Sequence, residues 1–349
     1  KADLFDENTV YVALDNHKEG DFNPYLFKST DLGATWKSIS SNLPKRTLVW
    51  RIVQDHVNKD LLFTATEFGI YVSLNAGDTW QKLPGTPTLS FRDLTIQKRE
   101  NDLVAASFGR GFYVLDDYSA LREMTPANLK RKGKLFAPRT AKWYVPRSNV
   151  GNTGADYYFS KNPPFGAVFT YHLSGDFSNL KSTRIKNEKA LNKKNMDVPF
   201  PGWDALDKEN QEQSINVLLT IQDPDGNIVR KLSTKAKKGS NRIAWDLKHF
   251  NPASIPENGK IRRRGFNSGA LVIPQNYTAT LYLDDNGAIT QLDEPVTFEV
   301  KSIRVGVLQG ISHQDYDAYR ESLSALVKEL DVIEDVMDSS EMKLMALKA

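Results

Sequence analysis

An eight-residue pattern, S-x-[D/N]-x-G-x-T-W, occurs at residues 29–36 and again 44 residues later, at residues 73–80. Each copy follows an aromatic-rich run and precedes a short apolar run that ends in Leu-Pro. A short polar acceptor, a glycine with positive φ and a closing tryptophan are typical of a tight turn between two strands. We therefore predict a structural role for the matching residues. They are Ser29, Asp31, Gly33, Thr35, Trp36, Ser73, Asn75, Gly77, Thr79 and Trp80.

The residues around the second copy predict four short strands within one repeat. These strands span 48–54, 61–67, 70–74 and 79–83. Four strands in roughly 40 to 45 residues is the period of a β-propeller blade. A third repeat begins with a strand at 91–97 and then loses the turn pattern, and the first repeat has too few residues for an inner strand. Because so few blades cannot close a ring, we expect a C-terminal piece of a longer polypeptide, with the remaining blades on a missing segment or a separate chain.

The two turns resemble the Asp-box, or bacterial neuraminidase (BNR) repeat, of β-propellers in sialidases, xyloglucan-cleaving hydrolases and the sortilin ectodomain. The surrounding residues 60–73 and 107–117 are similar to the last blades of large bacterial sortilin-like proteins. The resemblance covers residues 1–125 and implies that they are the terminal blades of a propeller that is incomplete at its N-terminus. It also implies a secreted protein, extracellular or on the bacterial cell surface, with the periplasm as the other compartment.

Residues 126–165 are predicted to be a connector, and residues 166–303 an immunoglobulin-like β-sandwich, because strand patterns alternate there with turn sequences. The run N-x-x-x-W-D at 241–246, followed by P-x-x-Y-T at 274–278, resembles small bacterial Ig-like modules appended to secreted enzymes. A lysine-rich insertion at 174–213 interrupts the sandwich. We interpret it as a solvated loop, because a nucleic-acid-binding patch would have more aromatic residues among its basic ones.

Residues 312–349 are predicted to be a helical tail. Ser312 can cap a helix, and apolar residues then recur at steps of three and four residues up to Ile333. A second amphipathic segment at 342–347 follows a predicted break at 338–340. The apolar face must pack on the sandwich, on a partner or on missing chain, because leaving it in water would be costly. The fold class is therefore mainly β: the last two to three blades of a partial propeller, a β-sandwich and a C-terminal helical segment.

The composition excludes several kinds of site. With no cysteine in 349 residues the chain can form neither disulfides nor cysteine-based zinc sites, and its five histidines are scattered singly. The sequence contains no phosphate loop, dinucleotide fingerprint or serine elbow, so we expect no cofactor and no metal. A net charge of +3 is too balanced to indicate a nucleic-acid partner, and no apolar run is long enough to predict a transmembrane helix.

Glycoside hydrolysis requires two carboxyl groups on opposite sides of the sugar, one of them kept protonated. The acidic residues at predicted inner or top positions are Asp15, Glu67, Asp93, Asp116 and Asp117. Asp116 and Asp117 are adjacent, so on a strand they would point to opposite faces, and we interpret them as a strand-terminating turn. No Tyr-Glu pair accompanies the arginines, as sialidase chemistry would require. The sequence therefore assigns no catalytic residue.

Two predicted inner strands contain an aromatic residue followed by an arginine, Trp50-Arg51 and Phe91-Arg92, 41 residues apart. We expect these positions to be equivalent in neighbouring blades, with both guanidinium groups in the same environment. The resemblance to sortilin-like propellers implies that the channel binds peptides, and paired arginines suit a carboxylate. The simpler interpretation is stacking within the blade, or pairing with Asp93 or Glu67. Arg110, flanked by glycines, is either a further ligand-binding residue or a lock for its turn.

Two functions from different classes follow from these observations. The favoured hypothesis is a non-catalytic, exported propeller protein that binds a protein or peptide. The alternative is the C-terminal part of an Asp-box glycoside hydrolase, sialidase-like or xyloglucanase-like, whose catalytic carboxylates lie outside this chain. The sequence nominates no catalyst, which favours the binding protein over the enzyme. Turnover of a polysaccharide would favour the hydrolase.

Overall fold

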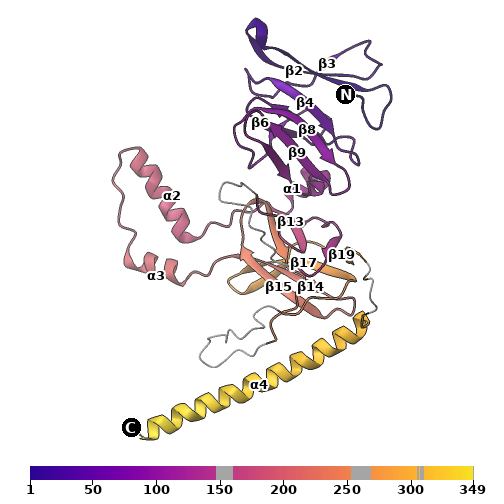
Figure 1. Ribbon diagram of the computed structural model, residues 1–349. Helices are drawn as coiled ribbons and strands as arrows, with labels where there is room; N and C mark the ends of the chain where they lie inside the picture. The colour runs from indigo at the N-terminus through magenta and orange to yellow at the C-terminus, as the bar shows by residue number, and fades with distance from the viewer. Residues whose placement is uncertain (147–159, 253–268, 305, 307–309, 349) are drawn as a thin grey trace. The chain divides into compact units, whose positions relative to one another are not determined.

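The computed structural model of this protein describes residues 1–146, 160–252, 269–304, 306 and 310–348. The chain forms two compact units, Lys1–Asn128 and Leu129–Ala349 (Figure 1). The fold is mainly β, as the sequence predicts, and each unit has its own sheets. The predicted connector and the predicted sandwich both include residues that lie outside the described ranges.

The first unit contains three antiparallel sheets, in which strands lie side by side in the order in which they occur along the chain. The first sheet consists of β1 (Val10–Asn16), β2 (Asp21–Ser29) and β3 (Lys37–Ser38). The second consists of β4 (Val49–Gln54), β5 (Leu62–Thr66), β6 (Gly69–Ser73) and β7 (Gln81–Lys82), and the third of β8 (Phe91–Gln97), β9 (Asp102–Ser107) and β10 (Phe112–Leu115). Its short helices are η1 (His17–Glu19) and η2 (Ser119–Glu123), and α1 (Pro126–Lys130) spans the boundary between the two units. Such small meandering sheets are the propeller-like architecture that the repeat predicts.

Hydrophobic side chains between successive sheets form the core of the first unit. Tyr11 of the first sheet clusters with Ile52 and Trp80 at the face of the second. On the opposite face of the second sheet, Phe63 clusters with Leu94 of the third. Every residue of β5 and β6 is buried, because the second sheet is covered on both faces. This double coverage explains why residues 61–73 read as a nearly continuous apolar run.

The two repeated turns share one hydrogen-bond arrangement. In both copies the serine hydroxyl accepts a hydrogen bond from the glycine N–H at 2.9 Å. The side-chain oxygen of the aspartate or asparagine accepts a second bond from the threonine N–H, at 2.8 Å in the first copy and 2.9 Å in the second. The glycines have φ of 91° and 94°, and the residues before them, Leu32 and Ala76, also have positive φ. The polar side chains of both turns therefore bond within the turn itself.

Replacing Asp31 by asparagine tests this equivalence between the turns. Hydrogen bonds from Thr35, and then from Ser29, lower the pKa of Asp31 from 3.8 to about 2. Its contribution to stability is therefore present above pH 3.8 and lost as the pH falls toward 2. We expect Asp31→Asn to fold with similar stability at neutral pH, because Asn75 makes the same bonds in the second copy. Acid titrations of unfolding should show a smaller acid loss in the variant, and an unchanged acid profile would contradict this.

The second unit is a β-sandwich. One sheet contains β11 (Gly133–Leu135), β13 (Ala167–Leu173) and β16 (Gly239–Trp245). The other contains β12 (Ala141–Trp143), β19 (Val296–Ser302), β17 (Asn276–Asp285), β14 (Asn216–Gln222) and β15 (Ile228–Lys235), and β18 (Ala288–Gln291) pairs with β17. Buried and half-buried residues alternate along β13 and β14, so each strand turns one row of side chains into the core.

Aromatic residues occupy the centre of the sandwich. Trp245, Tyr277 and Phe298 contact one another edge-on or tilted, with ring centroids 5.3–6.2 Å apart. The hydroxyl of Tyr277 donates to the carbonyl of Ile273 at 2.8 Å, and the indole N–H of Trp245 donates to the carbonyl of Lys248 at 2.8 Å. The tryptophan and tyrosine of the sequence pattern therefore bury their rings while satisfying their polar atoms.

The insertion between β13 and β14 is solvated, as predicted, but it is helical, so the prediction of a loop was wrong. It contains α2 (Leu180–Lys193) and α3 (Trp203–Gln211). The side chain of Asn179 caps α2 by accepting from the N–H of Ser182 at 2.8 Å. Arg184 of α2 pairs with Glu209 of α3 at 2.7 Å and with Glu188 at 2.6 Å, which links the two helices. Neither helix has a buried residue, so their apolar periodicity is weak and the sequence pattern did not reveal them.

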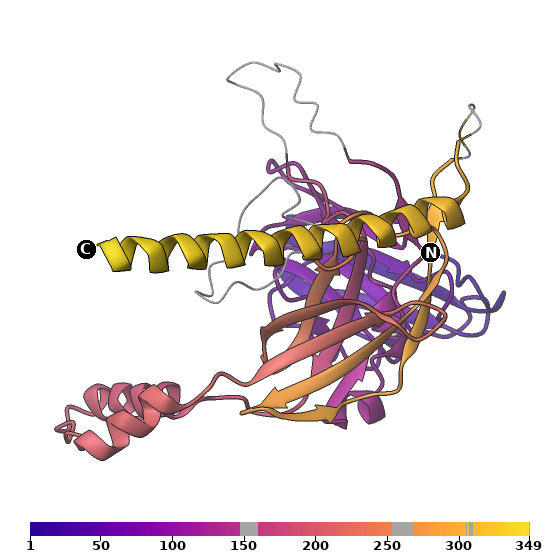
Figure 2. The same cartoon turned by 90° about the horizontal axis from the view of Figure 1, so that it is seen from below.

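The C-terminal segment forms one helix, α4 (His313–Lys348), and the predicted break at 338–340 is wrong (Figure 2). The polar run in this region contains no glycine or proline. Ser340 instead donates its hydroxyl hydrogen to the carbonyl of Val336, four residues earlier, at 2.7 Å. Serine in this back-bonded arrangement stays within a helix, so a polar pair alone does not end one.

Candidate functional site

The inner strands β4 and β8 each contain a bulge at the start of the strand. The register shifts between Val49 and Arg51 in β4 and between Phe91 and Asp93 in β8. The residue inserted in each bulge is therefore Trp50 in β4 and Arg92 in β8. Equivalent positions lie 42 residues apart, so the predicted equivalence of Arg51 with Arg92, at 41 residues, was wrong. The hydrogen bonds between the strands set this register, in which Trp50 corresponds to Arg92 and Val49 to Phe91.

In this register the arginine of each strand contacts a different kind of residue on the other strand. The guanidinium carbon of Arg92 lies 3.6 Å from the ring centroid of Trp50 and 5.0 Å from that of Phe108. Arg51 forms an ion pair with Asp93, with 3.1 Å between Nε and Oδ1. These five residues are called the inner rim below. The side chains of Arg51 and Asp93 are 54% and 62% exposed, and Phe108 is 71% exposed, so a ligand can reach the rim.

Other side chains hold the central tryptophan of the inner rim in place. The indole N–H of Trp50 donates to the Glu67 carboxylate at 3.1 Å, and the hydroxyl of Ser90 donates to the same oxygen at 3.1 Å. The ring of His17 contacts Trp50 edge-on, 5.7 Å between centroids. Trp50 therefore has its polar atom satisfied and is contacted by both Arg92 and His17.

The other two predicted ligand-binding residues lie apart from this stack. Phe91 is fully buried, and its ring contacts Tyr113 at 5.4 Å, so it belongs to the core between the sheets. Arg110 lies exposed in the turn between β9 and β10, between Gly109 and Gly111, which have φ of 74° and 75°. The glycines adopt the left-handed conformation that lets the turn close.

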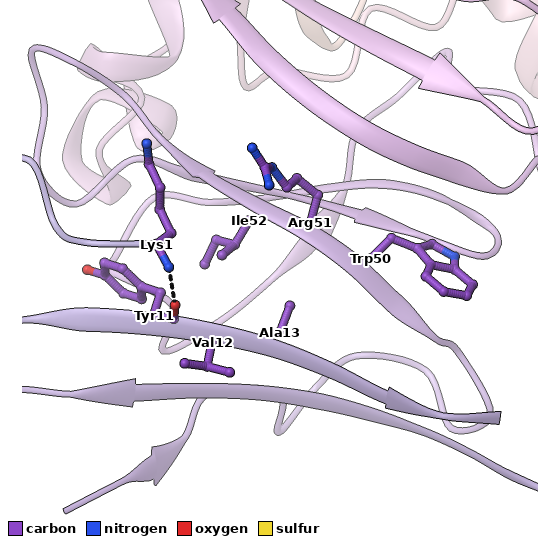
Figure 3. A pocket seen from close by; sticks show the side chains of 7 residues that line it. All are labelled: Lys1, Tyr11, Val12, Ala13, Trp50, Arg51 and Ile52. Carbon is purple, nitrogen blue, oxygen red and sulfur yellow. Dashed lines mark hydrogen bonds between the residues drawn. The ribbon is translucent and has the colours of Figure 1, made fainter. Parts of the chain in front are cut away.

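A pocket of about 230 Å³ lies beside β1, next to the inner rim (Figure 3). Its lining consists of Lys1, Tyr11, Val12, Ala13, Trp50, Arg51 and Ile52. The α-amino group of Lys1 donates to the carbonyl of Tyr11 at 2.7 Å, and the N–H of Tyr11 donates back to the carbonyl of Lys1 at 2.8 Å. Backbone groups of an antiparallel strand alternate between its two sides, so the N–H and C=O of Ala13 point to the same side as those of Tyr11. That side is the pocket.

A second repeat, which the sequence analysis missed, explains the position of this pocket. The N–H of Asp3 donates to Thr9 at 3.0 Å, as the N–H of Asp55 donates to Leu61 at 2.9 Å, 52 residues later. Each of the two aspartate carboxylates also accepts two backbone N–H groups of the turn that follows it. Residues 1–3 therefore lie beside β1 as the end of β4 lies beside β5 in the second sheet. The pocket lies where the first sheet lacks an equivalent of the beginning of β4. The pattern D-x-x-[D/N], which begins at Asp3 and again at Asp55, could have revealed this repeat in the sequence.

Asp55 is the centre of a buried polar network that fixes the end of the first unit. Arg122 of η2 donates to both carboxylate oxygens of Asp55 at 2.8 Å, and the hydroxyl of Tyr118 donates at 2.6 Å. Arg122 also donates to the side chain of Asn101 at 2.7 Å. Burial is the largest influence on the pKa of Asp55 and raises it, but the hydrogen bonds from Arg122, Tyr118 and the backbone together bring it down to about 2.

The remaining acidic candidates are engaged locally. Asp15 pairs with His17. Asp116 and Asp117 follow the end of β10, and Asp117 accepts a hydrogen bond from the hydroxyl of Ser119 at 2.6 Å. Within the described ranges, no group of three or more histidine, aspartate or glutamate side chains could hold a metal ion. None of the helices described is long and apolar enough to cross a membrane.

Comparisons with known proteins give only distant structural likenesses. No family model and no curated protein matches the sequence. An ancestral GH74 enzyme is 21% identical, with a TM-score of 0.27, over 38% of this chain and 15% of its own. The GH74 xyloglucanase of Xanthomonas campestris is 15% identical, with a TM-score of 0.24, over 29% of this chain and 17% of its own. The extracellular domain of a one-component system protein from B. thetaiotaomicron is 12% identical, with a TM-score of 0.23, over 80% of this chain and 28% of its own. This chain thus spans less than a third of each of these proteins, and the likenesses do not establish a family.

Proposed function

We propose that the first unit is part of the ring of a non-catalytic, exported propeller protein of the sortilin-like type, and that its inner rim binds an extended acidic peptide. The observation that carries the proposal is the exposed Arg51 beside an open pocket, on the strand that also holds the stacked Trp50. The arginines supply a site for a carboxylate, and the pocket supplies room for the backbone that bears it.

The two tryptophans of the repeated turns support the proposed ring. Trp80 is 3% exposed, and its indole N–H donates to the carbonyl of Ile39, in the preceding sheet region, at 2.7 Å. Trp36 occupies the same place in the first turn and is 46% exposed, with no sheet before its own among the described residues. We propose that a further blade covers Trp36 as the first sheet covers Trp80. That blade belongs to a further segment of the same protein or to a separate chain.

The energetics of the inner rim suit exchange with a ligand. An ion pair between exposed side chains contributes at most about 1 kcal/mol, so a ligand carboxylate can replace Asp93 at Arg51 with little loss. Arg92 is already ordered by its stack on Trp50, so less conformational freedom is lost when its N–H groups bind an acceptor. The inward-facing backbone of β1 at Ala13 offers main-chain hydrogen bonds to an extended peptide, the mode known as strand addition.

A glycoside hydrolase is the alternative proposal. Glu67 and Asp93, the carboxylates near the inner rim, lack the surroundings that a catalytic acid requires. The acid of a glycosidase is kept protonated by apolar surroundings. Glu67, by contrast, accepts two hydrogen bonds, and Asp93 is exposed and paired with Arg51. A hydrolase built on this unit would therefore take its carboxylates from blades outside the chain.

A binding experiment with fluorescein-labelled octapeptides tests the proposal. One peptide alternates Glu with Val, and its control alternates Gln with Val. We expect Arg51→Ala to weaken binding of the Glu peptide about 10- to 100-fold, because it removes a charge-assisted contact. Arg99→Ala is the matched control, because Arg99 is 81% exposed and pairs with the neighbouring Glu100. Equal affinity for the two peptides, or equal effects of the two variants, would refute a carboxylate site at Arg51.

A reducing-end assay on xyloglucan addresses the alternative. We expect no release of reducing ends by the chain. Release that depends on the protein would overturn the non-catalytic proposal and favour the hydrolase.

A further inference from the structure

Helix α4 carries a stripe of exposed apolar side chains, called the α4 stripe below. Its members are Tyr319, Leu326, Leu330, Ile333, Met337 and Leu344. Each is 50–65% exposed, and no residue of α4 is buried. The members are separated by steps of seven, four, three, four and seven residues, which places them along one side of the helix. An apolar stripe of this length on a helix is a surface built to be covered.

A different side of α4 contacts the sandwich. The hydroxyl of Tyr316 donates to the carbonyl of Leu271 at 3.2 Å, and Asp317 lies 3.9 Å from His249. The amino group of Lys328 lies over the ring of Phe250, 5.8 Å from its centroid. At 100° per residue, these contacts centre roughly 150° around the helix from the α4 stripe. The sandwich therefore does not cover the stripe.

We propose that a second copy of this chain covers the α4 stripe and that the two helices pair antiparallel as a coiled coil. Between Leu326 and Met337 the steps are four, three and four residues, which is the spacing of a coiled-coil seam, and the steps of seven extend the same line to Tyr319 and Leu344. The stripe is nearly symmetric about its own centre between Leu330 and Ile333. An antiparallel second copy would place Leu330 against Ile333, and Leu326 against Met337, so apolar residues meet along the whole stripe.

The charges beside the α4 stripe favour this orientation over a parallel one. In a parallel pair the flanking Glu329 of one helix approaches Glu334 of the other, and two carboxylates repel each other there. In the antiparallel pair Glu329 instead approaches Val336 of the second copy. The same sequence therefore disfavours the parallel dimer and leaves the antiparallel one without a like-charge contact at these positions. This inference does not depend on the function proposed for the first unit.

Sedimentation equilibrium of the whole chain tests the dimer. We expect a dimer at micromolar concentrations and expect Leu330→Glu to raise its dissociation constant at least about 100-fold, because an unpaired charge would be buried. Val332→Glu is the matched control, since Val332 is 53% exposed on another side of α4. Circular dichroism should show that both variants keep the helix. A wild-type monomer, or equal effects of the two variants, would overturn the proposal.

Disulfide trapping tests the orientation, because the natural chain contains no cysteine. We expect Leu326→Cys mixed with Met337→Cys to give a disulfide-linked pair of different chains. Leu326→Cys alone should not cross-link, because residues 326 of two antiparallel helices lie about 16 Å apart along the axis, beyond the reach of a disulfide. Cross-linking of Leu326→Cys with itself would show a parallel dimer and overturn the antiparallel assignment.

Discussion

Replacing Arg122 by alanine is expected to lower the free energy of unfolding of the first unit by about 3–5 kcal/mol. The substitution leaves the Asp55 carboxylate, which has no exposed surface, without the guanidinium that bonds both of its oxygens. Leaving a buried charge without its guanidinium partner is among the most destabilising changes a single substitution makes. Because Arg122 belongs to η2 and Asp55 follows β4, the variant should also release the segment after the third sheet.

Hydrogen exchange of the β4 and β5 amides under increasing urea measures this effect within the first unit. Arg99→Ala serves as the control, because the Arg99 side chain is 81% exposed and its ion pair with Glu100 should contribute at most about 1 kcal/mol. The pH dependence gives a second readout. With a folded-state pKa of about 2 against 3.8 in the unfolded chain, the contribution of Asp55 is present above pH 3.8 and is lost as the pH falls toward 2. Arg122→Ala should abolish most of that acid dependence, and equal losses in both variants would contradict the network.

Trp80→Ala is expected to destabilise the first unit by about 3–5 kcal/mol, whereas Trp36→Ala should cost less than about 1 kcal/mol. The two residues close the same repeated turn, so the sequence alone predicts the same contribution to stability for both. Trp80 is buried against Ile39 and donates its indole N–H to that residue, whereas Trp36 is 46% exposed. Removal of Trp80 would leave a cavity between two sheets, and removal of Trp36 would leave none.

Urea unfolding monitored by hydrogen exchange of the β6 amides compares these two variants directly. The pair is internally controlled, because both substitutions remove the same side chain from the same turn. Equal destabilisation would show that the tryptophan acts within its own turn and not between sheets. In that case the exposed Trp36 would no longer support a further blade.

The repeat made the strands of the first unit predictable, and the sheet order followed from them. The second copy at 73–80 fixed the positions of β6 and β7, and the alternation of apolar residues fixed those of the sandwich strands. The helices of the insertion were missed because Arg184 and the cap at Asn179, not an apolar stripe, hold them. The prediction of a break in α4 was wrong because the hydroxyl of Ser340 bonds to the carbonyl of Val336 within the helix.

The sequence predicted only some of the residues and contacts of the inner rim. Trp50, Arg51 and Arg92 were identified from sequence, and the pairing of Arg51 with Asp93 was among the expected contacts. The equivalence of Arg51 with Arg92 was wrong by one residue. The bulges that shift each strand depend on which N–H groups find partners in β5 and β9, and a residue pattern does not record that choice.

The amino-acid sequence by itself determined the elements that depend on local chemistry: the turns at 29–36 and 73–80, the alternating strands and the amphipathic tail. Tertiary structure decided which Trp is buried, that Arg92 stacks on Trp50, and that Asp55 finds Arg122, 67 residues away. The physical reason is range. Turn bonds and side-chain periodicity act within a few residues, whereas burial and ion pairing depend on neighbours that only the folded chain brings together.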